Sequence, residues 1–186
     1  MSSRTVATII TALVLLTVLA LMLRSWRRRS NRDAALPAGY PLPADLGREL
    51  ASAAALYVAT TPRDTPLERL NIPGLGFRAR GGVSVFERGV LLELAGSPTL
   101  FIPTDAVQIV ADATVAIDRV VEPGGLLRLG WGLNTTSADA PAHNVSEGVD
   151  SYFRFSDPVD RRAISEAISS TRAPGKTEFG TEESEV

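Results

Sequence analysis

Residues 76–103 have the sequence GFRARGGVSVFERGVLLELAGSPTLFIP. Apolar and polar residues alternate up to Glu87-Arg88-Gly89, and a second run begins immediately after it, as in two half-buried strands. Glu87-Arg88-Gly89 is predicted to form a hairpin turn, and its glycine suits a positive φ angle. Gly96-Ser97-Pro98 predicts another turn, followed by a strand over Thr99–Ile102. This stretch therefore predicts a meander of antiparallel strands.

The β pattern continues after this meander. Alternation predicts further strands over Val115–Val121, Leu127–Leu133 and Val149–Phe155. On the N-terminal side, Leu46–Ala53 is compatible with a short helix or a turn, which leads into a strand over Leu56–Thr60. Strands at such short intervals are typical of a sandwich or a barrel.

An amphipathic helix is predicted after the last strand. Ser156 or Asp157 can act as the N-cap, and Pro158 suits the first turn. Pro174-Gly175 is expected to end the helix, and the acidic residues 173–186 are expected to form a disordered tail. The apolar stripe of the helix comprises Val159, Ala163, Ile164, Ala167 and Ile168.

The N-terminal part contains an uncharged run of eighteen residues, Val6–Leu23, with the sequence VATIITALVLLTVLALML. As a helix this run covers about 27 Å, close to the hydrocarbon thickness of a bilayer. The run is longer than the apolar run of a secretory signal, which usually has about 7–15 residues and is followed by a small-x-small cleavage site. A buried core helix is rarely apolar on every face. We therefore predict a transmembrane helix over residues 5–23.

A basic cluster follows the apolar run, whereas only Arg4 precedes it. The positive-inside rule predicts a single-pass protein of the cell (plasma) membrane, with its N-terminus outside and its C-terminal domain in the cytoplasm. The absence of cysteine fits a reducing compartment. The cluster can also hold anionic headgroups, at about 1 kcal/mol per charge, and both roles stay open. It comprises Arg24, Arg27, Arg28, Arg29 and Arg32.

The rest of the chain is acidic. Residues 34–186 carry thirteen basic and twenty acidic side chains. Nucleic-acid binding normally requires a basic surface, so we expect no nucleic-acid partner. The predicted organisation is a transmembrane helix (5–23), a basic juxtamembrane segment with a Pro-rich spacer (24–43), one domain (44–172) and the tail (173–186).

The chain resembles actinobacterial single-pass membrane proteins with a bacterial PH-like domain, which are often loosely labelled transporters or export proteins. The resemblance covers residues 5–170 and implies a mainly β, PH-like barrel or sandwich of about seven antiparallel strands with a C-terminal helix. It supplies no catalytic residues, and one span cannot by itself enclose a transport path. The segments that carry it are Leu56–Thr61, Leu67–Arg69, Gly74–Arg80, Phe101–Pro103, Ile117–Val121 and Val149–Arg154.

The sequence gives no support for catalysis, a cofactor or a metal site. His143 is the only histidine, and it lies in a polar loop over residues 134–148. Without cysteine, the usual zinc ligand patterns are missing. Gly74-Leu75-Gly76 does not fit a dinucleotide-binding loop, because Ala79 stands where the third glycine is required. We predict that the protein is not an enzyme.

Four arginines form a candidate site for lipid or phosphate contact: Arg63, Arg69, Arg78 and Arg80. Arg78 and Arg80 alternate on one strand, which would place two guanidinium groups on the same face for bidentate phosphate contacts. The structural alternative is a set of ordinary surface charges, since Asp64 and Glu68 lie nearby.

Three functional hypotheses follow. The first is a membrane-anchored module that contacts lipid through its span and docks an unidentified protein partner at the cytoplasmic face. The second is binding of anionic lipid headgroups by the Arg78 and Arg80 region. The third is an accessory subunit of a membrane transport or envelope complex. In it the small or polar residues Thr8, Thr11, Ala12 and Thr17 help to pack the span.

Overall fold

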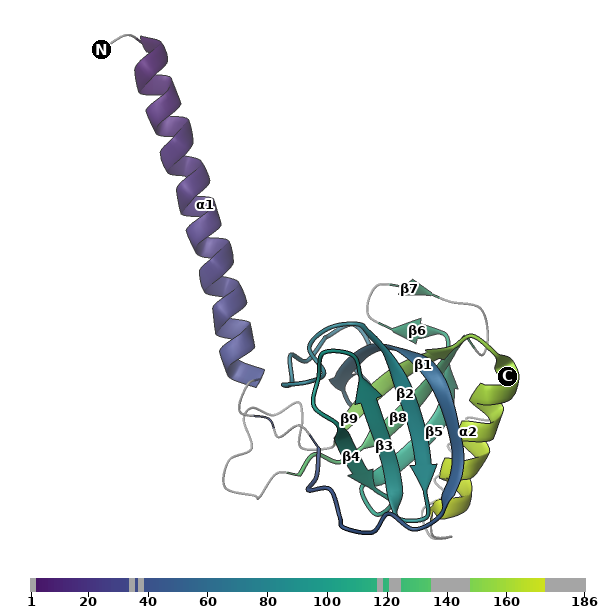
Figure 1. Ribbon diagram of the computed structural model, residues 1–186. Coiled ribbons are helices and arrows are strands. Elements are labelled where there is room, and N and C mark those ends of the chain that lie inside the picture. The colour runs from purple at the N-terminus through teal and green to yellow at the C-terminus, as the bar shows by residue number, and fades with distance from the viewer. Residues whose placement is uncertain are drawn as a thin grey trace, which may run out of the picture.

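The structure, a computed structural model, describes residues 3–33, 36, 39–116, 119–120, 125–134 and 148–172 (Figure 1). The predicted tail and His143 lie outside these residues. The elements are α1 (Ser3–Asp33), β1 (Glu49–Pro62), β2 (Ala79–Phe86), β3 (Gly89–Leu94), β4 (Leu100–Pro103), β5 (Val107–Ala113), β6 (Val115–Ala116), β7 (Arg119–Val120), β8 (Leu126–Trp131), β9 (Val149–Phe155) and α2 (Pro158–Thr171).

Seven strands form one antiparallel sheet, in the order β4-β3-β2-β1-β9-β8-β5. Strand β1 belongs to both halves of this sheet, because Glu49–Tyr57 pairs with β2 and Ala55–Pro62 pairs with β9. The register shifts between Tyr57 and Ala59, and such a bulge increases the local twist of a strand. The curled sheet and the C-terminal helix confirm the predicted mainly β fold class (Figure 1).

The prediction of a short helix or turn over Leu46–Ala53 is wrong. Strand β1 already begins at Glu49 and pairs with β2 from there. The hydroxyl oxygens of Ser52 and Ser84 lie 2.8 Å apart and join the two strands further. Alanine favours a helix by less than about 1 kcal/mol per residue, and pairing along the whole strand outweighs that preference.

The turn between β2 and β3 forms where it was predicted, but the predicted positive φ angle at Gly89 is wrong. The glycine serves a close approach instead. A Cβ atom at this position would lie 2.3 Å from the carbonyl oxygen of Ile102 and 2.7 Å from the ring of Phe101. Only a residue without a side chain lets β3 and β4 come this close.

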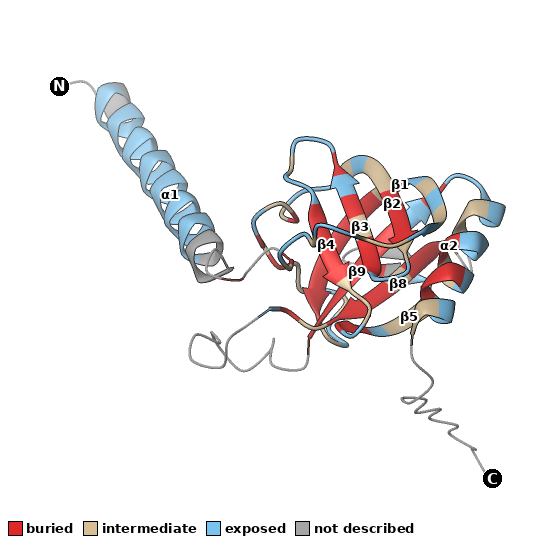
Figure 2. Ribbon diagram, turned by 60° about the horizontal axis from the view of Figure 1, so that its bottom comes forward, coloured by how far each residue is buried: buried red, intermediate tan, exposed pale blue. Residues whose placement is uncertain are grey.

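The hydrophobic core lies inside the curled sheet, and α2 packs against it. Figure 2 shows buried residues concentrated on the strands, whereas α1 is exposed from Thr5 to Arg28. The largest fully buried side chains are those of Trp131, Tyr57 and Phe153. Helix α2 contributes Ile164, Ala167 and Ile168 to the same core.

The predicted apolar stripe of α2 is too long at its N-terminal end. Val159 is 68% exposed, and Ala163 is exposed as well. The first turn is held by its cap, because the Asp157 carboxylate accepts a hydrogen bond of 2.8 Å from the Val159 amide. Packing against the core begins at Ile164. The helix therefore starts at this position because of its cap, and not because its first turn makes apolar contacts.

The chain between β5 and β8 differs from the single alternating strand predicted over Val115–Val121. The two short strands β6 and β7 pair with each other as a separate sheet. Ile117 and Asp118 lie outside the described residues. Ala116 is 3% exposed and packs in a second, smaller cluster with Val58, Ala59, Leu126 and Tyr152.

Helix α1 is, among the described residues, the one helix long and apolar enough to cross a membrane. It is exposed from Thr5 to Arg28. The hydroxyls of Thr11 and Thr17 donate to the carbonyl oxygens of Ala7 and Leu13, so they bond within the helix. The helix continues beyond Leu23 to Asp33, which adds about 15 Å at the usual rise.

The residues after α1 attach to the domain, although a spacer was predicted there. Leu36 is 3% exposed and belongs to the main core. The Tyr40 amide donates to the Phe101 carbonyl at 2.9 Å, and the Tyr40 hydroxyl donates to the Gly132 carbonyl at 2.9 Å. Only residues 34–35 separate Asp33 from Leu36, a reach of about 10 Å when fully extended.

Candidate functional site

The connection between β1 and β2, residues 63–78, carries three of the four predicted arginines, and Arg80 follows in β2. The structure does not bring the four together. Arg63 and Arg69 make internal contacts, whereas Arg78 and Arg80 are exposed. The connection therefore has two parts. One is a frame anchored by Arg63 and Arg69, and the other is an exposed surface that includes Arg78.

Arg63 anchors the start of the connection. Its Nε lies 3.0 Å from Asp150 Oδ1, and its Nη2 donates to Gln108 Oε1 at 2.6 Å. The Arg63 side chain is 10% exposed, and that of Asp150 is completely buried. The Arg63 guanidinium thus balances a buried carboxylate on β9, a structural role that the sequence did not indicate.

A second arginine completes this ion cluster. Arg128 Nη2 lies 2.8 Å from Asp150 Oδ2 and 2.6 Å from Asp64 Oδ1. Burial would lower the pKa of Arg128, but the carboxylates of Asp64 and Asp150 together raise it above its ordinary value. Asp64 itself has a positive φ of 56°, and its amide donates to Asp150 at 3.2 Å. The buried carboxylate of Asp150 therefore holds the guanidinium groups of Arg63 and Arg128 and the turn at Asp64.

Two glycines make room for the cluster. A Cβ at Gly130 would lie 2.9 Å from Asp150 Oδ1, and one at Gly148 would lie 2.8 Å from Arg63 Nη2. Side chains at either position would displace the charged groups. Gly130 lies within β8 and Gly148 directly precedes β9, and only the fold shows which groups they accommodate.

Arg69 and Tyr57 anchor the end of the connection. Arg69 donates to the Val58 carbonyl at 2.8 Å and to the Gly76 carbonyl at 3.0 Å. The Tyr57 hydroxyl donates to the Leu75 carbonyl at 2.7 Å. Leu70, Ile72 and Leu75 are each no more than 1% exposed. The connection is thus a packed part of the domain.

A buried row of polar side chains continues from Tyr57 into the core. Trp131 donates to the Ser151 hydroxyl at 3.0 Å, and Ser151 and Thr60 lie 2.8 Å apart. Thr60 Oγ1 lies 2.9 Å from the Tyr57 hydroxyl. Burial raises the pKa of Tyr57. Each hydroxyl in the row has a partner, so the row is a structural network that fixes the core.

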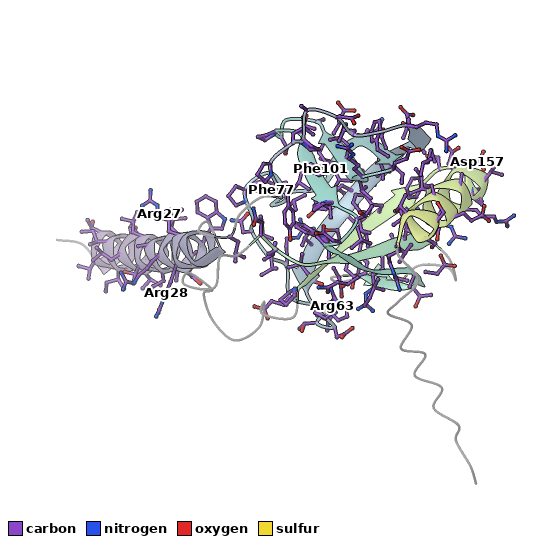
Figure 3. The ribbon with its side chains drawn as sticks, turned by 90° about the horizontal axis from the view of Figure 1, so that it is seen from below. Arg27, Arg28, Arg63, Phe77, Phe101 and Asp157 are labelled. Carbon is purple, nitrogen blue, oxygen red and sulfur yellow. The ribbon has the colours of Figure 1, made fainter. Side chains whose placement is uncertain are left out.

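The same connection carries two large apolar side chains that are exposed. Phe77 is 75% exposed and Leu67 is 70% exposed. Figure 3 shows Phe77 and Asp157 at opposite sides of the domain. The sequence pattern placed Phe77 on the strand, but β2 begins only at Ala79, so Phe77 escapes burial. Arg78 and Arg80, both exposed, extend this surface.

Arg80 also lines a groove together with Arg154 and Arg161. Neither Arg154 nor Arg161 was a candidate from the sequence. Arg154 is the next-to-last residue of β9, and Arg161 lies in the first turn of α2. Such proximity appears only after the strands are paired.

The arginines predicted to form the juxtamembrane cluster lie on α1. Arg24, Arg27 and Arg28 are exposed on this helix, and Figure 3 shows Arg27 and Arg28 on different sides of it. Arg29 and Arg32 belong to the same helix. Arg24 lies three and four residues before Arg27 and Arg28, so the helix brings these three arginines to the same broad face.

Three comparisons place the chain among known proteins. A family model described as "Bacterial PH domain-like" matches residues 34–169. A search of curated proteins gives no match. Among solved structures, a chain of "The 8S snRNP Assembly Intermediate" is similar at 10% identity and a TM-score of 0.46, with 77% of this chain and 97% of that chain covered.

Proposed function

Because the chain belongs to the bacterial PH domain-like family, we propose that it is a membrane-anchored, non-enzymatic interaction module that docks a protein partner at the cytoplasmic face. The domain and the long apolar helix together fit a membrane-anchored module. Docking of a partner is the further step that the proposal adds.

The observation that carries this step is the exposure of Phe77 and Leu67 on an anchored frame. Aromatic side chains are enriched among the residues that dominate binding energy at interfaces. Arg69 and Tyr57 hold the backbone around Phe77 in place. A pre-ordered surface loses less conformational entropy when a partner binds. The frame therefore favours recognition by a fixed shape.

The cytoplasmic side is supported by charge. The arginines after the apolar run outnumber the one before it, and such an excess marks the cytoplasmic end of a span. Since α1 is followed closely by Leu36 in the domain core, the domain would stay near this membrane face.

Photocrosslinking in intact membranes tests partner docking. A photoreactive phenylalanine analogue replaces Phe77 in the full chain, and the matched control carries it at Val159, an apolar residue that is similarly exposed at 68%. We expect a discrete crosslinked protein from position 77 and none from position 159. Identical products from both positions, or none from position 77, would contradict the proposal. A multi-span membrane protein as the product would support an accessory subunit.

Binding of anionic lipid is a second candidate function. It is favoured by the position of exposed Arg78 and Arg80 directly after exposed Phe77. Arginines beside an apolar side chain suit an anionic membrane surface, where each charge contributes about 1 kcal/mol. Arg63 and Arg69 are engaged inside the domain, so this candidate concerns the other two arginines.

A spin label distinguishes this candidate. The chain has no cysteine, so Phe77→Cys gives a single labelling position in the full chain. If the surface contacts lipid, the label becomes immersed in bilayers that contain phosphatidylglycerol, and Arg78→Ala with Arg80→Ala reduces the immersion. Equal immersion in neutral bilayers, or no dependence on the two arginines, would exclude lipid binding through their charges.

A further inference from the structure

Three arginines on α1 share a shallow concavity with two apolar residues. All five side chains are exposed. Because the lining belongs to α1 alone, this surface shares no residue with the surface around Phe77 that is proposed for partner docking. The concavity is lined by Ala20, Leu23, Arg24, Arg27 and Arg28.

The turn of the helix brings the three guanidinium groups together. Arg27 and Arg28 follow Arg24 by three and four residues, spacings at which side chains are neighbours on a helix. Each residue adds about 100° of rotation. Arg27 and Arg28 therefore flank Arg24, and Figure 3 shows these two on different sides of the helix. Like charges at such spacings repel each other, so a bound anion between them would stabilise the arrangement.

The apolar part of the concavity lies toward the middle of the span. Ala20 lies one turn before Arg24, and Leu23 lies one turn before the next arginine. Apolar residues on the hydrocarbon side and positive charges at the end of the span match the order of acyl chain and phosphate in a phospholipid. A soluble anion would make no use of the apolar part. The lining therefore favours a lipid as the occupant.

Two further features support a position of the three arginines at headgroup level. The uncharged run ends at Leu23, directly before Arg24. Trp26 is 57% exposed, and tryptophan is enriched at the membrane–water interface. The first acidic residue of the chain is Asp33, which follows Arg28 by more than one helical turn. Lipid phosphates at this level can therefore supply the counter-charge.

Three charges on one face favour a lipid with more than one phosphate. Once the first phosphate of such a lipid is bound, binding of the second is intramolecular and gains from a high effective concentration. We infer that the α1 concavity binds one phospholipid that carries two phosphates, with the phosphates at the three arginines and an acyl chain against Ala20 and Leu23. The inference rests on the membrane-anchored part of the proposed function, and it does not depend on partner docking.

Native mass spectrometry of the full chain released from nanodiscs tests the site, with cardiolipin as the probe. Phosphatidylglycerol is supplied at twice the molar amount of cardiolipin, so that both lipids contribute the same number of phosphates. We expect one cardiolipin to be retained per chain, in preference to phosphatidylglycerol. Equal retention of the two lipids per phosphate would overturn the inference, because it would show general attraction to a charged surface.

Arginine variants locate the site. Arg24→Ala should raise the cardiolipin fraction needed for half saturation by about fivefold, which corresponds to about 1 kcal/mol for one charge at the membrane surface. Arg4→Ala is the matched control, because it removes the same charge near the opposite end of α1, and its effect should be less than about twofold. Equal effects of these two variants would overturn the inference.

Two controls separate the inference from the proposed function. Arg78→Ala with Arg80→Ala should leave cardiolipin retention unchanged, whereas a complete loss would assign the lipid to the second candidate function and overturn the inference. Incorporation of each chain into nanodiscs is measured first. A chain that does not enter the nanodiscs would contradict the membrane anchor and the inference together. A chain that enters them but retains no cardiolipin would overturn the inference alone.

Discussion

Arg63, Arg69, Arg78 and Arg80 look alike in the sequence, since each lies in or beside one polar connection. In the structure the four arginines differ in which hydrogen-bond acceptors lie within reach of their side chains. Arg63 meets the buried Asp150, and Arg69 meets two backbone carbonyls. The acceptors lie far away in sequence or on the backbone, where residue patterns give no signal. Arg78 and Arg80 are both exposed, but only Arg80 lies on a strand, because β2 begins at Ala79.

Asp150 gives the first residue-scale prediction. Asp150→Ala would leave Arg63 and Arg128 without their shared carboxylate, and their side chains are only 10% and 23% exposed. We expect a loss of about 3 kcal/mol in the free energy of unfolding, measured by urea denaturation of the full chain in detergent.

The control for this prediction is Asp45→Ala. Asp45 pairs with Arg88 at 3.0 Å, but both side chains are more than half exposed. Removing such a surface pair should cost less than about 1 kcal/mol. Equal losses in the two variants would show that the Asp150 cluster does not stabilise the domain.

The three tyrosines give a prediction about pH. Burial raises the pKa of Tyr57, Tyr40 and Tyr152 above the ordinary value of 10.0. The unfolded chain therefore loses tyrosine protons at a lower pH than the folded chain, so stability should fall as the pH rises above about 10. Tyrosinate absorbance should increase together with unfolding. An increase well before unfolding would contradict the raised pKa values.

At the scale of elements, turn residues and alternation located most strands between residues 76 and 103, because these signals are local. The start of β1 could not be found this way. Its alanines have no strand preference of their own, and β1 exists because β2 and β9 pair with it. The predicted apolar stripe of α2 was too long for a similar reason, since only packing against the sheet decides where burial of the helix begins.

Glycine contacts give a prediction at this scale. Gly89→Ala would place a Cβ 2.3 Å from the Ile102 carbonyl, which should force β3 and β4 apart and cost about 2 kcal/mol. Gly82→Ala is the control, because its nearest contact would be the Ala53 carbonyl at 3.9 Å and its φ is not positive. That variant should be neutral or slightly stabilising. Urea denaturation compares them, and equal stability would refute the close approach.

At the scale of the whole molecule, composition and the apolar run predicted a helix able to cross a membrane and one β domain after it. The junction between them was not predicted. Prolines and a glycine between Asp33 and Pro43 indicated a spacer, because such residues disfavour regular structure. Irregular backbone can still pack, however. The hydrogen bonds of Tyr40 depend on Phe101 in the distant strand β4 and on Gly132, and Leu36 belongs to the main core.

The junction gives the last prediction. Leu36 is 3% exposed in the core, whereas Leu42, a residue of the same type in the same segment, is 57% exposed. Leu36→Ala should therefore lower the free energy of unfolding by about 2–4 kcal/mol, and Leu42→Ala should change it by less than about 0.5 kcal/mol. Urea denaturation of the full chain in detergent measures both. If the two variants lose the same stability, the domain begins after this segment and a free spacer separates it from α1. If only Leu36→Ala is destabilised, Leu36 is part of the domain core, and the domain therefore begins within a few residues of the end of α1.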